Sequence, residues 1–202
     1  MMHEHNFLQG THETLQSIPR FLTLDDITWE VMNEKQLITF FKENYNMGRP
    51  DVLEWENAST KQRTFLGLEY TNTGIVQNKG HNYQYVVGIT QANNGKKAVA
   101  AITKLAPKSL VFEGYSYHNK NIVLLAYTEV NFFCQGRHVF RVMAEKIADA
   151  VQGKVLAYTS ESEMGRQLEI GKKLKSIMAE KGNPDCYDEE ELFVILSMRA
   201  KR

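Results

Sequence analysis

The chain has 202 residues, of which 43% are hydrophobic and 24% charged, so it can bury a globular core. Its 24 basic and 24 acidic residues cancel, which argues against a protein that binds nucleic acid through a general excess of positive charge. No apolar run reaches the roughly 18 to 20 residues of a membrane helix, so we expect no membrane association.

The cysteine content and the polar start of the chain predict an intracellular protein. Cys134 and Cys186 make neither a disulfide framework nor a paired metal motif, and the first residues lack the features of a secretion signal. We therefore expect a reducing, cytoplasmic location and no metal cofactor. Residues 1–20 include a His-x-His pair that would suit a metal, but a mobile N-terminal arm is the simpler interpretation. Residues 21–202 are expected to form a single domain.

The first clear element is a helix that begins after Asn33. Asn33 can cap it, with Gln36 as the capping-box partner, and Gly48 and Pro50 follow its end. Just before it, residues 22–32 fit either a short helix or a strand. An aromatic and aliphatic stripe along the helix faces either a core or a ligand groove, and core packing is the commoner use. This stripe contains Leu37, Phe40, Phe41 and Tyr45.

Residues 51–80 are polar and irregular, and we expect them to supply substrate-facing loops. The alternation that follows predicts a four-strand meander. Its strands cover residues 83–91, 97–105, 109–117 and 122–130, with breaks at Asn94-Gly95, at Pro107-Lys108 and at residues 118–121.

After residue 130 the hydrophobic period changes from that of a strand to that of a helix. One helical face runs from Val139 to Val151, and a strand is predicted over residues 154–159. A helix of this length between two strands implies a parallel crossover. A second helix over residues 164–179 and a closing strand over residues 192–198 complete the pattern. The fold class is therefore α+β, with a mixed, mostly antiparallel central sheet flanked by helices.

This order of elements is similar to the fold of the GNAT family of N-acetyltransferases, over roughly residues 82–198. In that family a motif of the form Val-x-x-x-(Tyr)-(Arg/Gln)-x-x-Gly-x-(Gly/Ala) follows the fourth strand, and its backbone amides hold the pyrophosphate of acyl-coenzyme A. Val130 begins a segment that aligns with it, with Gln135 on the first polar position and Val139 on an apolar one. His138 stands where the first glycine is expected and Phe140 where the last small residue is expected.

The resemblance implies acetyl-coenzyme A as co-substrate and an N-acyltransferase reaction. Its expected coenzyme-binding residues are Val130, Asn131, Gln135, Gly136, Arg137, His138, Val139 and Phe140. Glu129, at the end of the fourth strand, is the candidate general base, although a lone strand carboxylate is more often solvated. The family's helix tyrosine, the general acid, is missing from residues 164–179, so Tyr187 or Tyr158 is the candidate replacement.

Two further signals have ordinary explanations. Cys134 at a helix start, with His138 four residues later, fits a thiol nucleophile, but no third orienting group is visible. The acidic run from Asp185 to Glu191 fits a cation or a basic partner, although a solvated segment before the last strand is the commoner case.

Two functional hypotheses follow. The first is transfer of an acetyl group from acetyl-coenzyme A to a small-molecule or peptide amine. The alternative is a binding or regulatory module of the same fold that has lost acyl-coenzyme A chemistry. A homodimer is left open under both hypotheses.

Overall fold

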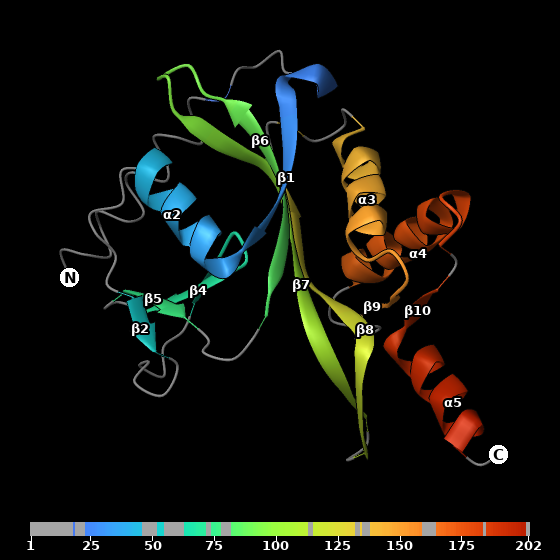
Figure 1. Ribbon diagram of the computed structural model, residues 1–202. Helices are drawn as coiled ribbons and strands as arrows, with labels where there is room; N and C mark the ends of the chain where they lie inside the picture. Colours follow the sequence, from blue (N-terminus) through green and yellow to red (C-terminus); the bar gives the residue numbers. More distant parts are fainter. Residues whose placement is uncertain are drawn as a thin grey trace. The chain divides into compact units, whose positions relative to one another are not determined.

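The computed structural model describes residues 18, 23–45, 52–54, 63–71, 74–77, 82–112, 115–131, 134, 138–158, 165–183 and 185–200 (Figure 1). Within these residues the chain is a mixed α+β protein, which confirms the predicted fold class. The N-terminal arm lies outside them, apart from the buried Ile18. The chain divides into two compact units. Unit 1 comprises Met1–Lys104 and Tyr127–Phe140, and unit 2 comprises Leu105–Ala126 and Arg141–Arg202.

The larger of two sheets has six strands. In hydrogen-bonded order they are β1 (Ile27–Asn33), β6 (Gln84–Gln91), β7 (Lys97–Phe112), β8 (Tyr115–Val130), β9 (Val155–Tyr158) and β10 (Cys186–Asp188). This sheet is mixed, because β1 runs antiparallel to β6 whereas β9 runs parallel to both β8 and β10. The second sheet has the order β2 (Val52–Glu54), β5 (Gly74–Gln77), β4 (Leu68–Thr71) and β3 (Arg63–Phe65).

The helices follow the strands in a regular alternation in the second half of the chain. Within the described part of the chain they are the short 3-10 helix η1 (Leu24–Asp26), α2 (Glu34–Asn44), α3 (Val139–Ala150), α4 (Gly165–Glu180) and α5 (Glu189–Ala200). The short helix and the strand that were alternatives for residues 22–32 both occur, because η1 leads directly into β1.

Helix α2 forms where its capping signal predicts. The side chain of Asn33 accepts a hydrogen bond from the Gln36 amide (2.9 Å), and the Gln36 side chain accepts one from the Asn33 amide (2.8 Å). The predicted stripe is buried and faces the core of unit 1, where it packs with residues of β4, β5, β6 and β7. Each such side chain adds about 1.5–3 kcal/mol of apolar burial. Core packing is therefore the observed use of the stripe.

The predicted meander is wrong after its first strand. Instead of three short strands broken at Pro107-Lys108 and at residues 118–121, the chain forms β7 and β8, each continuous over 16 residues. Pro107 lies within β7 and is exposed there. Proline has no amide hydrogen to donate and its ring restricts φ, so a strand tolerates it where no donor is needed. The two strands are hydrogen-bonded neighbours, and this pairing overrides the local turn signals.

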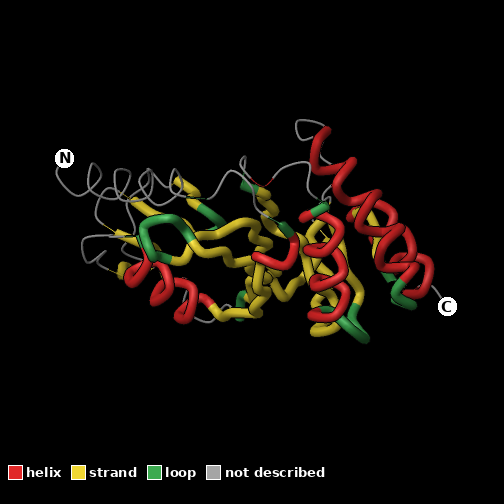
Figure 2. Tube along the Cα trace, turned by 90° about the horizontal axis from the view of Figure 1, so that it is seen from above, coloured by secondary structure: helices red, strands yellow, loops and turns green. Residues whose placement is uncertain are grey.

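The parallel crossover predicted after residue 130 is confirmed. Strand β8 pairs with β9 from Ile122↔Val155 to Leu125↔Tyr158, and α3 connects the two strands. In unit 2, the second helix, α4, lies beside α3 (Figure 2), and the Arg141 side chain of α3 forms a 2.9 Å ion pair with Glu180 of α4. The apolar side of α4 is buried at Leu174, Ile177 and Met178.

The predicted closing strand at residues 192–198 is also wrong, because these residues belong to helix α5. The strand that closes the sheet is instead β10, within the acidic run. The carboxylate of Asp188 accepts a hydrogen bond from the Glu190 amide (2.9 Å), and three glutamates in the first turn favour the positive end of the helix dipole. A short apolar run does not by itself distinguish a strand from a helix.

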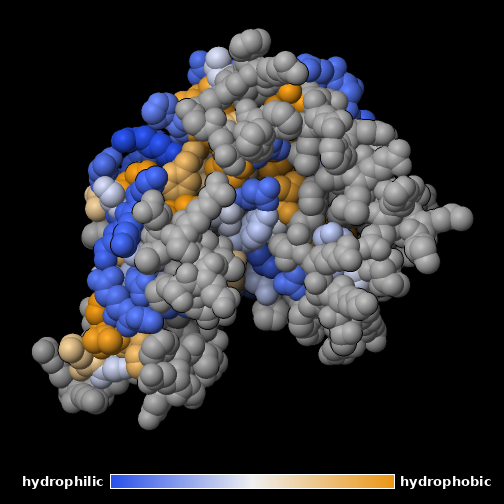
Figure 3. All heavy atoms as spheres, turned by 180° about the vertical axis from the view of Figure 1, so that it is seen from behind, coloured by the Kyte–Doolittle hydropathy of each residue, from blue (hydrophilic) through white to orange (hydrophobic). Residues whose placement is uncertain are grey.

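Helix α5 carries hydrophobic residues on more than one side. Leu192 packs into a small core with Ile122 and Ala157, and Leu196 packs against the same core. Val194 and Met198 are 50% and 65% exposed, and Figure 3 shows a hydrophobic patch over this helix. None of the described helices combines the length and hydropathy that a membrane span requires.

Candidate functional site

The predicted base, Glu129, lies on β8 in unit 1 and is exposed. Its carboxylate accepts a hydrogen bond from the hydroxyl of Tyr127, two residues earlier on the same face of the strand. Burial, and then the hydrogen bond to Glu129, raise the pKa of Tyr127, so its hydroxyl stays protonated and remains a donor. The Glu129 carboxylate is therefore held by a fixed partner.

Hydrogen bonds join the end of β8 to β7. The Asn131 amide donates to the Ala100 carbonyl (2.8 Å), and the buried Asn131 side chain reaches the Val99 carbonyl (3.4 Å). The chain then turns, because the Cys134 amide donates to the Asn131 carbonyl (2.8 Å). The Asn131 amide is thus engaged within the sheet.

The predicted diphosphate loop is described only at its end. Gln135, Gly136 and Arg137 lie outside the described residues. His138 is exposed and has a φ of 58°, in the left-handed region that glycine adopts most easily. The backbone at His138 thus has a conformation that glycine adopts more easily than histidine.

The first turn of α3 follows at once. Val139, on the apolar motif position, is 2% exposed, whereas the side chain of Phe140 is half-buried. The first amides of a helix have no partner within the helix, and the helix dipole favours an anion beside them. The start of α3 is therefore a suitable place for a phosphate, with Phe140 as the bulky residue nearest to it in sequence.

Cys134, which fits a thiol nucleophile in sequence, is completely buried. A reactive thiol needs partial exposure and a lowered pKa. Its burial therefore indicates that Cys134 is a packed core residue and not a nucleophile. Among the described residues, no group of three or more His, Cys, Asp or Glu side chains is arranged to hold a metal ion.

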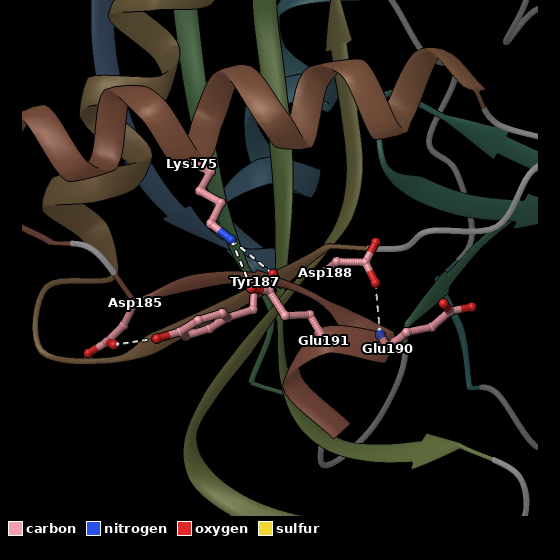
Figure 4. Close-up of polar contacts among 6 residues, drawn as sticks. All are labelled: Lys175, Asp185, Tyr187, Asp188, Glu190 and Glu191. Carbon is pink, nitrogen blue, oxygen red and sulfur yellow. Dashed lines mark hydrogen bonds and ion pairs between the residues drawn. The ribbon is translucent and has the colours of Figure 1, made fainter. Parts of the chain in front are cut away.

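The predicted acid, Tyr187, lies on β10 in unit 2 and belongs to a polar cluster shown in Figure 4. Its hydroxyl donates to the Asp185 carboxylate (3.1 Å), and the Lys175 Nζ lies 5.3 Å from its ring centroid. Lys175 also pairs with Glu191 at 2.8 Å. Burial and the hydrogen bond to Asp185 raise the pKa of Tyr187, so it is protonated at neutral pH. Tyr158, the other candidate acid, is buried against α4.

The acidic run is more ordered than a solvated segment. Asp185, Asp188 and Glu191 each accept a specific hydrogen bond, from Tyr187, from the Glu190 amide and from Lys175, respectively. These contacts hold β10 and the start of α5 together. Most of the run's described contacts thus serve the local structure of unit 2.

Several polar residues of unit 1 were not singled out from sequence. Tyr127 is detectable in principle, because residues two apart on a strand share a face. Lys104, Glu69 and Tyr85 come from three different strands, so only the tertiary structure places them together.

We compared the chain with models of protein families, with characterised proteins and with solved structures. No match was found.

Proposed function

We propose that this protein is an acyl-coenzyme A-dependent N-acyltransferase, which transfers an acetyl group from acetyl-coenzyme A to an amine. The observation that carries the proposal is the junction of β8 with α3. A strand that ends in a candidate base leads through a turn to a left-handed residue and a helix start, and the helix returns to a parallel strand. This is the arrangement that the GNAT resemblance implies for residues 130–140.

The fit of the coenzyme rests on the backbone. At His138 the main chain already has the left-handed conformation, so the histidine side chain does not prevent the turn that the motif requires. A diphosphate would accept hydrogen bonds from amides of residues 135–140, and Arg137 and His138 would add positive charge beside the helix dipole. The main chain near Val130 would hold the arm that carries the thioester.

The reaction would proceed by direct attack. The amine nitrogen forms a bond to the thioester carbonyl carbon, the C–S bond breaks, and the amine loses one proton while the thiolate gains one. Glu129 would accept the proton from the amine, directly or through water. The thiolate would take its proton from water.

A thermal-shift titration with acetyl-coenzyme A tests the binding step. A ligand at a hundred times its dissociation constant stabilises the folded state by about 2.7 kcal/mol. We expect a clear upward shift for the native protein and its loss in Gly136→Trp. The matched control is Gln152→Trp, which adds the same side chain in the exposed turn after α3 and should keep the shift.

A turnover assay tests the chemistry. Release of free thiol from acetyl-coenzyme A in the presence of amines should fall by about 10²–10⁴-fold in Glu129→Gln, because a general base is lost. Absence of any shift at millimolar acetyl-coenzyme A, with the protein folded, would reject the acyltransferase. The alternative, a non-catalytic module, draws support from Phe140 at a small-residue position and would then replace it.

A further inference from the structure

We draw no further inference here: the strongest candidate, the exposed hydrophobic face of helix α5 around Val194 and Met198, carries none because nothing in the described part of the chain shows what covers it.

Discussion

Tyr158 occupies the space that a side chain at Gly171 would need. A Cβ atom built at Gly171 would lie 2.2 Å from Cδ2 and 2.4 Å from Cε2 of the Tyr158 ring. Residue 158 ends β9 and residue 171 lies in α4, so this contact sets how closely the helix approaches the strand. Glycine is otherwise a poor residue in the middle of a helix, and its presence here is explained by the close packing.

Gly171→Ala should therefore destabilise the protein. Overpacking costs about 1–3 kcal/mol, and the better helix propensity of alanine returns up to about 1 kcal/mol. We expect a net loss of about 1–2 kcal/mol in urea unfolding. In a Tyr158→Ala background Gly171→Ala should instead stabilise the protein, because the clash is gone and only the higher helix propensity of alanine remains. The exposed substitution Lys172→Ala should change stability by less than about 0.5 kcal/mol. A loss of the same size in both backgrounds would contradict the packing argument.

The backbone at His138 predicts opposite effects for glycine and for a β-branched residue. Its φ of 58° destabilises an ordinary L-residue by about 1–2 kcal/mol, whereas glycine adopts it without this strain. Glycine loses part of that gain through the entropy of the unfolded chain. His138→Gly should thus be neutral or stabilising by up to about 1 kcal/mol, whereas His138→Val should be destabilising by more than about 1 kcal/mol. Chemical denaturation of the three proteins measures this, and equal stability of the two variants would refute the assignment.

The hydroxyl of Tyr45 supports a buried strand amide. The Val99 amide donates to it at 2.7 Å, and Tyr45 is completely buried. Tyr45→Phe keeps the ring but leaves this amide without its partner, which should cost about 1–3 kcal/mol of unfolding free energy. Hydrogen exchange at Val99 should accelerate more than at its neighbours on β7. Unchanged exchange at Val99 would show that the hydrogen bond contributes little.

Stability should fall at alkaline pH. Burial raises the pKa of the Cys186 thiol from 9.0 to about 12, and burial also raises the pKa values of Tyr45, Tyr85 and Tyr127 from 10.0. Above pH 9 to 10 the unfolded chain loses these protons while the folded chain keeps them, so the free energy of unfolding decreases as pH rises. Urea unfolding at pH 8 and pH 10.5 should show the decrease.

The raised pKa of the Cys186 thiol also predicts its reactivity. At pH 9 the folded thiol is almost entirely protonated, so iodoacetamide should modify Cys186 slowly in the native protein and rapidly in urea. Fast native alkylation at Cys186 would contradict its burial and its raised pKa.

Only part of the candidate site could be predicted from the sequence. Glu129 and Val139 were predicted from the point at which the hydrophobic period changes from that of a strand to that of a helix. Such a change is a local signal. The hydrogen bond from Tyr127 to Glu129 needs only the two-residue repeat of a strand. By contrast, the engagement of the Asn131 amide by Ala100 depends on pairing between residues 31 positions apart, which no local pattern reports.

Local sequence signals were enough to predict several elements of the fold. The capping box at Asn33 and Gln36, the stripe of α2 and the crossover through α3 all arise from contacts within one element or from its hydrophobic period. Tertiary structure alone decided the length of β7 and β8, the helical state of residues 192–198 and the meeting of Glu69, Tyr85 and Lys104. In each of these cases the deciding energy comes from partners distant in sequence, which supply a strand neighbour, a core surface or an opposite charge that the local residues do not encode.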